Sequence, residues 1–430
     1  MSFDRARRIA DAVLLEGYVL YPYRASSAKN RWRFPFGVLA PRDWSEAGGC
    51  EPWWMEAQCL VEPLGSPHVR GRLRFLRARR RTVAARDPVD GSYRPVDALD
   101  AGGRLALAWD EGEAREVDFE DVPGASATVP FAMAAERQEE PLPDASGAPA
   151  GRVLRAGAAI SGVVAVRSEP VPADRPLLRL SVRVENRTSW ADPAASRDAI
   201  LPASCLAAHL LLAVEGGAFV SLLDPPAWAA AAAAACRSTR AYPVLAGAEG
   251  ERDLVLASPI ILYDHPRIAP ESPGDFFDAC EIDELLALRT ATLGDAEKRE
   301  ARATDPRAAA VLDRVAGLSP ELLGQLHGAT RDLRAAEMVP RAPPPAGGSV
   351  PRPGQRVRLR PGCRRTDAQD LLYAGLTATV RAVHRDVDDG EWLAVTIDDD
   401  PAAELHDWYG RHHYYRLDEV EPLAEEGAAP

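Results

Sequence analysis

The side chains best suited to chemistry lie within one stretch of the chain, Ser258 to Leu293. An apolar run there gives way to a loop that contains several prolines and the residues Asp264, His265, Glu271, Asp275 and Asp278. Carboxylates and imidazoles carry out general acid–base catalysis, and carboxylates also ligate Mg²⁺. A long loop with this chemistry commonly binds a substrate or a partner, so this stretch is the first candidate site.

Two functions fit this loop, and they make different demands on its geometry. A metal-dependent hydrolase or maturation enzyme would need its acidic and imidazole side chains to converge within a few ångström in a concave pocket. The residues available to such an enzyme are Asp264, His265, Glu271 and Asp275. A non-catalytic binding protein would instead spread the same side chains over a surface that contacts its partner.

A third interpretation of the acidic residues is structural. Either Asp275 or Asp278 can cap the helix that we expect next, because a side-chain oxygen there accepts a hydrogen bond from an unpaired backbone N–H. The first turn of that helix carries Glu281, Asp283 and Glu284, where the helix dipole favours negative charge. We expect capping and dipole effects to account for much of this acidic cluster, and we rank a catalytic metal last.

No local signature of a common catalytic site is present. The chain lacks the nucleophile motif G-x-S-x-G, the phosphate-binding Walker A motif and the dinucleotide-binding motif G-x-G-x-x-G. Histidines gather at positions 406, 412 and 413, but adjacent residues of a strand face opposite sides of a sheet, which disfavours a shared metal ion. We therefore predict no catalytic residue, no metal and no cofactor, and we favour a binding protein over an enzyme.

The N-terminal region is rich in aromatic residues. We interpret residues 17–23 as a strand, and in residues 24–39 basic side chains alternate with Trp and Phe. That alternation can mark nucleic-acid binding through stacking and phosphate contacts. The net charge of -13 disfavours a phosphate partner, so we interpret residues 24–39 as a half-buried strand and regard nucleic acid as an unlikely ligand.

Both regions contribute to the predicted site for a protein partner. The aromatic block supplies side chains of the types that often anchor interfaces, and the acidic loop supplies charge. The predicted partner-binding residues are Tyr21, Tyr23, Arg24, Trp32, Asp264, His265, Glu271, Asp275 and Asp278.

The chain is long enough for two or three domains, and its pattern predicts an α+β fold. The pattern of residues 1–257 predicts a β-rich, sandwich-like body of short strands, which begins with a helix over residues 3–16. We expect hairpin turns at Glu111-Gly112 and at Glu215-Gly216-Gly217, a loop over residues 138–151, and a short helix in the alanine run 229–235.

The remaining residues read as a helical unit, a linker and a small β domain. Residues 258–339 begin with a strand at 259–263 and the acidic loop, then form helices, one of which is capped by Asp305 and Pro306. Residues 340–354 are a Pro-rich linker. The pattern of five short strands in residues 355–424 predicts an SH3-like barrel, and residues 425–430 read as a disordered tail.

Composition places the chain among soluble proteins of a reducing compartment. It is 46% hydrophobic and 27% charged, with no apolar stretch long enough to span a membrane and no convincing signal peptide. Its six cysteines are scattered and none form a C-x-x-C pair, which favours reduced thiols over a disulfide framework. We therefore predict a cytoplasmic protein.

Four segments together resemble one protein family. They are LEGYVLYPYRAS (residues 15–26), GAFVSLLDPP (217–226), the central stretch 258–288 and YYRLDEVEP (414–422). This combination resembles uncharacterised proteins associated with NiFe-hydrogenase operons in actinobacteria and some other bacteria, and the similarity spans nearly the whole chain. The resemblance implies a cytoplasmic accessory role in assembling or maturing a NiFe-hydrogenase, with a hydrogenase subunit or maturation factor as the protein partner, but it supplies no reaction and no catalytic residues.

Overall fold

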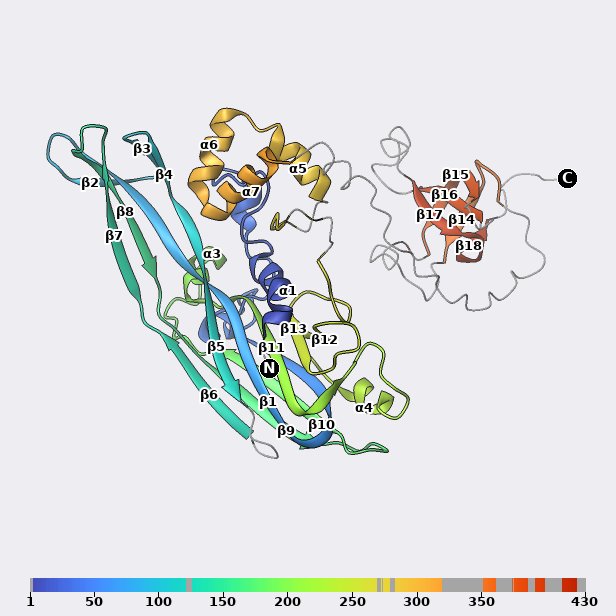
Figure 1. The fold of residues 1–430 in the computed structure, drawn as a ribbon. Coiled ribbons are helices and arrows are strands. Elements are labelled where there is room, and N and C mark those ends of the chain that lie inside the picture. Colours follow the sequence, from blue (N-terminus) through green and yellow to red (C-terminus); the bar gives the residue numbers. More distant parts are fainter. Residues whose placement is uncertain are drawn as a thin grey trace. The chain divides into compact units, whose positions relative to one another are not determined.

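The computed structural model describes residues 3–120, 126–268, 272, 274–278, 283–318, 351–360, 373, 375–385, 391–398 and 412–423. The chain divides into two compact units, Met1–Thr330 and Arg331–Pro430, which we term the large unit and the small unit. Antiparallel strands dominate both units, and α1–α7 lie in the large unit (Figure 1). The fold is therefore β-rich and of the α+β class, as predicted.

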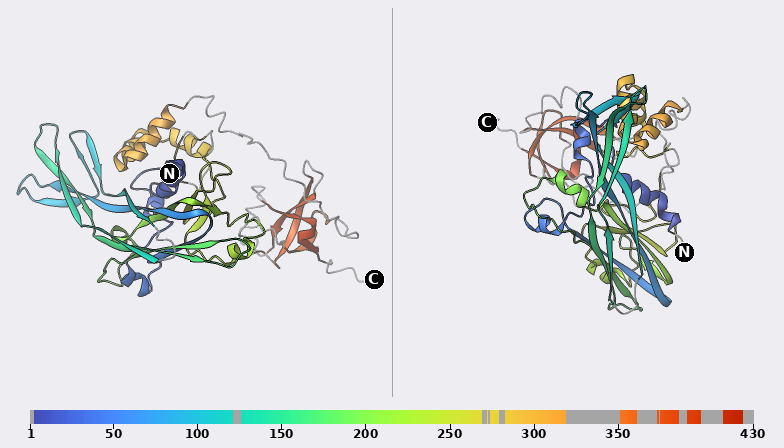
Figure 2. Two further views of the ribbon diagram at one scale, coloured as in Figure 1. Left: turned by 60° about the horizontal axis from the view of Figure 1, so that its bottom comes forward. Right: turned by 90° about the vertical axis from the view of Figure 1, so that its left-hand side faces the viewer.

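The helices of the large unit are short. They are α1 (Asp4–Leu15), η1 (Ala28–Trp32), α2 (Arg42–Glu46), α3 (Arg197–Ile200), η2 (Leu201–Ala203), α4 (Ala230–Ala235), α5 (Asp283–Ala291), α6 (Asp295–Thr304) and α7 (Pro306–Ala316). Among the described residues, no helix has the length and apolarity needed to cross a bilayer. Figure 2 shows α1 and α5–α7 on the same side of the sheet.

The strands of the large unit vary widely in length. They are β1 (Trp54–Arg86), β2 (Tyr93–Val96), β3 (Ala98–Ala101), β4 (Arg104–Leu107), β5 (Trp109–Glu120), β6 (Ser126–Met133), β7 (Glu136–Pro143), β8 (Pro149–Gly157), β9 (Ile160–Pro170), β10 (Leu178–Asn186), β11 (Leu206–Val220), β12 (Tyr242–Leu245) and β13 (Leu254–Ser258). All except β3 and β4 belong to one sheet of eleven strands, with the main order β12-β13-β11-β1-β10-β9-β6.

One strand, β1, joins most of this sheet because it runs over 33 residues. Along one edge it pairs first with β10 and later with β5, and along the other edge it pairs with β11 from Leu60 to Leu76. The register with β11 shifts between Pro63 and His68, an irregularity of the kind that lets a strand bend. Residues from both parts of β1 consequently contribute to a single apolar core.

The sheet curls around that core. Phe75 of β1 and Phe131 of β6 come from distant strands of the sheet, yet their ring centroids are 5.9 Å apart. Gly71 of β1 is needed where the ring of Phe119 crosses the strand, since a Cβ atom there would lie 2.1 Å from the ring. Hydrogen bonds join the strands into one sheet, so the two separate sheets of a sandwich are not formed, although the curled faces share a core.

The strands β6 to β9 form one long hairpin. Met133 of β6 pairs with Ile160 of β9, and Glu136 of β7 pairs with Gly157 of β8, so the register continues across the break between the strands. In Figure 1 β7 and β8 extend with β2 into an arm of the sheet. The loop predicted over residues 138–151 is therefore wrong for most of its length, because pairing with β8 overrides the high content of Pro and acidic residues.

The N-terminal segment, residues 17–34, connects the sheet to the helices. Tyr18 is fully buried, and its hydroxyl donates to the Asp305 carboxylate (2.6 Å) and accepts from the Gly112 N–H of β5 (2.7 Å). Asp305 also caps α7 ahead of Pro306, as predicted. One hydroxyl group thus links three parts of the large unit that are far apart in sequence.

Two buried arginines strengthen the same junction. The Arg33 guanidinium lies 3.5 Å from the Trp109 ring centroid and donates to the Asp110 carbonyl oxygen (2.8 Å). Arg81 donates to the carbonyl oxygen of Thr304 at the end of α6 (2.7 Å). Both arginine side chains are buried, and burial lowers the pKa of each guanidinium group because it disfavours the charged form.

Several expected elements of the large unit are confirmed and others are wrong. The helices predicted over residues 3–16 and in the alanine run are present as α1 and α4. Residues 17–39 contain turns and the η1 helix, so the two strands predicted there are wrong. The turns predicted at Glu111-Gly112 and Glu215-Gly217 are also wrong, because β5 and β11 continue through them along β1.

The small unit contains a five-stranded antiparallel sheet in the order β17-β16-β15-β14-β18. Its strands are β14 (Arg356–Leu359), β15 (Thr377–Arg385), β16 (Glu391–Ile397), β17 (His413–Arg416) and β18 (Val420–Pro422), close to the five that we predicted, with the η3 turn (Leu417–Glu419) between the last two. Within the described residues β17 does not pair with β18, so the sheet is not closed into the predicted barrel. Most of the predicted linker, at 340–350, and the predicted tail at 425–430 lie outside the described residues.

We expect Tyr18→Phe to destabilise the protein by about 2–3 kcal/mol, because it leaves the buried Asp305 carboxylate and the Gly112 N–H without this partner. Urea unfolding followed by circular dichroism measures the loss. Tyr21→Phe is the control, since no hydrogen bond of the Tyr21 hydroxyl is seen among the described residues, and it should change the free energy of unfolding by less than about 0.5 kcal/mol. Equal losses in the two variants would contradict a special role for Tyr18.

Candidate functional site

Asp264 and His265 close the outer edge of strand β12. One oxygen of the Asp264 carboxylate accepts from the Leu245 N–H (2.7 Å), and the His265 N–H donates to the Leu245 carbonyl oxygen (2.7 Å). The other Asp264 oxygen accepts from the Ser221 hydroxyl. Both groups of Leu245 that point away from the sheet are therefore occupied, as they would be by another strand.

Pro243 completes the closure of this edge. Backbone groups in an antiparallel strand alternate in direction, so Pro243 faces outward like Leu245, and proline has no N–H to offer. An exposed strand edge can pair with another chain, and proteins block such edges with prolines and charged side chains. Asp264 is best explained as part of this block.

Asp278 lies in a buried ion pair. Its carboxylate bonds to the Lys29 ammonium and accepts from the Tyr21 N–H (3.2 Å). The Asp278 side chain has no exposed surface, whereas the Lys29 side chain is 37% exposed. The pair therefore joins the central stretch to the N-terminal segment and leaves the carboxylate inaccessible to a partner.

The neighbours of Asp278 dock on the same segment. The buried Tyr23 hydroxyl donates to the Phe276 carbonyl oxygen (3.1 Å), and the Gly17 N–H donates to the Phe277 carbonyl oxygen (3.0 Å). Burial, and then the Asp278 charge, raise the pKa of Tyr23. Tyr23 and Phe277 both adopt positive φ angles, 64° and 61°, which non-glycine residues adopt only when surrounding contacts hold them there.

The other predicted site residues are dispersed. Asp275 is half-buried, and burial raises the pKa of its carboxyl group while Arg314 opposes the rise. Arg24 forms an ion pair with Glu297 of α6 (3.1 Å). Glu271 and the side chain of Trp32 lie outside the described residues.

The structure thus brings Tyr21 and Asp278 together, and it places Tyr23 beside the same segment. It ties Asp264 and His265 to the separate strand β12 instead. Among the residues that the structure describes, no three His, Cys, Asp or Glu side chains are placed to hold a metal ion. The geometry required of the hydrolase is therefore not seen in this part of the chain, although Glu271 is untested.

Large apolar side chains are exposed on the segments that hydrogen bonds connect to Asp264. We define the contact patch as Leu223, Tyr242, Ile261 and Tyr263, whose exposed fractions are 57%, 42%, 74% and 59%. Hydrogen bonds connect the segments that carry them: Ser221 accepts from the Leu223 N–H (3.2 Å) and donates to Asp264, and Tyr242 pairs with Ser258. Exposed apolar side chains gathered in one region commonly mark a protein interface.

Sequence reasoning missed this patch because it assigned the apolar run to a strand. Residues 259–263 are not a strand, and the strand predicted there is wrong. The flanking residues Pro259 and Pro266 were the available signal, since proline disfavours a central strand. The central stretch therefore remains the candidate site, and its exposed apolar residues are more accessible than the carboxylate of Asp278.

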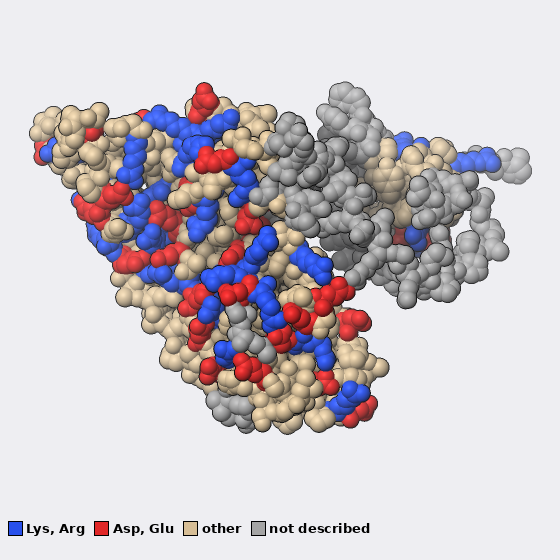
Figure 3. Space-filling model, viewed as in Figure 1, with Lys and Arg blue, Asp and Glu red and all other residues tan. Residues whose placement is uncertain are grey.

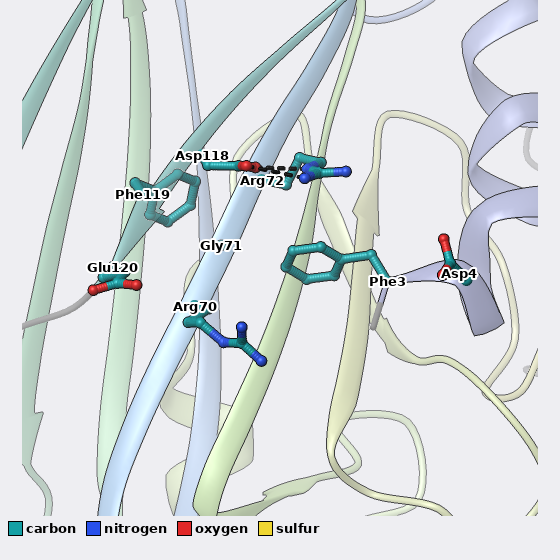
Figure 4. Close-up of a pocket in the computed structure, with 8 residues that line it drawn as sticks. All are labelled: Phe3, Asp4, Arg70, Gly71, Arg72, Asp118, Phe119 and Glu120. Carbon is teal, nitrogen blue, oxygen red and sulfur yellow. Dashed lines mark hydrogen bonds and ion pairs between the residues drawn. The ribbon is translucent and has the colours of Figure 1, made fainter. Parts of the chain in front are cut away.

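A shallow depression of about 410 Å³ lies between the start of α1 and the strands β1 and β5 (Figure 4). Arg72 in its wall donates to both oxygens of Asp118 (2.6 and 2.9 Å), and Arg70 donates to Glu215 (2.9 Å). Both guanidinium groups already bind carboxylates, so the depression presents no unpaired cationic wall to an anion. We assign it no cofactor.

Charged side chains of both signs are mixed on the large unit. On the face shown in Figure 3, basic and acidic residues alternate across the centre of the large unit. On the sheet, Arg74 bonds to Glu116 and Asp11, and Arg155 bonds to Glu111 and Glu140, which follows the same pattern. The described residues on this face therefore do not form the continuous basic surface that a nucleic-acid backbone requires.

Comparisons with known proteins identify no relative. No family model, curated protein or solved structure matches the chain.

The Lys29–Asp278 pair can be tested with the only two lysines of the chain. We expect Lys29→Met to reduce the free energy of unfolding by about 1–3 kcal/mol, because the buried Asp278 carboxylate loses its counter-ion. Lys298→Met is the control, since the half-buried Lys298 of α6 donates to the Ala291 carbonyl oxygen at the end of α5 and not to a buried carboxylate. A loss of the same size in both variants, measured by urea unfolding, would show that Lys29 has no special role.

Buried His209 of β11 predicts how stability depends on pH. Burial lowers the pKa of His209 from 6.5 to about 4, opposed by its hydrogen bond to Ala207. The unfolded chain therefore binds a proton that the folded chain excludes, and stability falls as pH decreases from about 6.5 to 4, by about 3 kcal/mol. His209→Leu should reduce this slope. His68→Gln should retain it, because the His68 side chain is only partly buried, with 40% of its surface exposed. Unfolding curves at several pH values compare the two variants.

Proposed function

We propose that this chain is a non-catalytic accessory protein that acts through protein–protein contacts. The observation that carries the proposal is the contact patch, in which four large apolar side chains stand exposed within the stretch that the sequence singled out and the segments joined to it. Tyrosine, leucine and isoleucine side chains bury much apolar area when a partner covers them. Asp224 and Arg240 are exposed near the same segments and supply the polar surroundings that interfaces usually have.

The accessibility of the acidic residues favours binding over catalysis. A general base needs a carboxylate that can reach a substrate. Both oxygens of the Asp264 carboxylate already accept hydrogen bonds, one from the Ser221 hydroxyl and one from the Leu245 N–H. The bond to Leu245 closes the edge of β12. Asp278 is buried against Lys29. We therefore do not advance the metal-dependent hydrolase as a second candidate.

We further propose that the partner belongs to the assembly or maturation of a NiFe-hydrogenase. The resemblance of residues 15–26, 217–226, 258–288 and 414–422 supports this assignment, and two of these segments carry the contact patch residues Leu223, Ile261 and Tyr263. The expected compartment is the cytoplasm, because the scattered cysteines fit a reducing environment. The small unit would add a second contact and raise the effective concentration of the partner.

Capture from native cytosol tests the function and the patch together. The tagged chain should recover a hydrogenase subunit or maturation factor, identified by mass spectrometry. Ile261→Asp combined with Tyr263→Asp should lower recovery at least tenfold, because it places charges in an apolar interface. The control is Val89→Asp, since Val89 is 93% exposed in a turn outside the patch and its variant should capture normally.

Two outcomes of the capture experiment would contradict different parts of the proposed function. If the patch variants capture the partner as well as the unmodified chain does, the patch is not the contact surface. If no hydrogenase component is recovered, the assignment of the partner is wrong. Circular dichroism of each variant must match that of the unmodified chain, so that loss of capture reports loss of contact and not unfolding.

A further inference from the structure

The large sheet has several edges, and two of them are closed by side-chain and backbone groups of the same chain. At β12, Asp264 and His265 occupy the outward groups of Leu245. At β5, the outward Gly112 N–H donates to the Tyr18 hydroxyl and the outward Asp110 carbonyl oxygen accepts from Arg33. Closing an edge in this way prevents another chain from pairing with it.

The edge formed by β6 is less protected, because Pro130 is the one residue of this strand, Ser126–Met133, of a type that blocks strand edges. Its partner β9 places Ser161 opposite Ala132, but the Ser161 N–H donates to the Thr188 hydroxyl (3.0 Å) and the Ser161 carbonyl oxygen accepts from the Arg187 N–H (2.8 Å). Both groups of Ser161 therefore point away from β6. In an antiparallel pair, the residue opposite such a position also points outward, so Ala132 directs its N–H and C=O away from the sheet.

Alternation extends this assignment along the strand. Ser126, Thr128 and Pro130 share the outward direction of Ala132, and no described residue bonds to their backbone groups. All four side chains are exposed and uncharged. The margin of the large unit at which Figure 1 places β6 is mostly uncharged in Figure 3. This edge consequently lacks the charged side chains that protect the following strand, β7.

Building on the proposed binding role, we propose that β6 is a docking edge that accepts an extended strand from a protein partner. A row of outward N–H and C=O groups at alternate residues is matched only by the backbone of another strand, so the edge itself specifies the conformation of its occupant. The inward side chains of β6 specify its composition. Val129 and Met133 are only partly buried against the core, so the added strand would cover them with apolar side chains at every second position.

Pro130 argues against a second copy of this chain as the occupant. It removes one donor from the outward row, so a heterologous strand loses one hydrogen bond opposite it. When two copies of β6 pair antiparallel about a two-fold axis, each contributes its own Pro130 and two hydrogen bonds are lost. The edge therefore favours a different chain over self-association.

Panning a library of random ten-residue peptides against the full chain tests the docking edge without a hydrogenase component. Enriched peptides should carry apolar residues at alternate positions, and their binding should slow hydrogen exchange in residues 126–133. Thr128→Pro with Ala132→Pro removes two outward donors without touching the hydrogen bonds to β9, and it should weaken peptide binding at least tenfold. Pro130→Val adds a donor and should strengthen it.

Several results would overturn the docking edge. They are the absence of enriched peptides, protection at another segment, unchanged affinity in the double proline variant, or a dimer in analytical ultracentrifugation that this variant dissolves. If the proline variant fails to fold, hydrogen exchange of the unmodified chain tests the proposal by itself, because bound peptide must slow exchange in residues 126–133. Ile261→Asp with Tyr263→Asp should leave peptide binding intact, so failure of the contact patch and failure of the docking edge give different results.

Discussion

The hydroxyl group of Tyr18 makes the interaction on which the arrangement of the large unit depends. It joins a strand, an irregular N-terminal segment and the start of a helix at one buried point, through Gly112 and Asp305. Burial, and then the nearby Asp305 charge, raise the pKa of Tyr18, so the hydroxyl keeps its proton and remains a donor to the carboxylate. The helices α5–α7 are thereby fixed over the sheet by a directional contact as well as by apolar packing.

This junction also explains why the acidic stretch is so rich in polar residues. A segment that crosses from the sheet to the helices has few regular backbone partners, and its buried polar groups must still be satisfied. Asp278 bonds to Lys29 and Tyr21, and Asp264 bonds to Ser221 and Leu245. Asp264 and Asp278, two of the carboxylates that first suggest catalysis, therefore hold segments of the fold together.

A curled open sheet has strand edges that can pair with other chains, and the edges of this sheet are protected to different degrees. Side chains close β12 and part of β5, whereas β6 presents small, uncharged residues with outward backbone groups. The contact patch and the β6 edge lie at opposite ends of the strand order, since β12 and β6 are its two termini. If both proposed surfaces bind, the chain would hold a partner at more than one point.

Local physical chemistry determined part of this structure from the sequence alone. The cap of Asp305 and Pro306, the helical period of α1 and α7 and the alternation of β15 and β16 depend on neighbours within a few residues, so the sequence predicts them. Only the tertiary structure decided that β11 continues through Glu215-Gly217, because the long strand β1 pairs with it on both sides of that turn signal. The tertiary structure likewise decided that Asp278 is buried and that Ile261 is exposed. Burial depends on segments that are distant in the sequence, since Lys29 lies more than 200 residues from Asp278. A local sequence pattern cannot reveal such contacts.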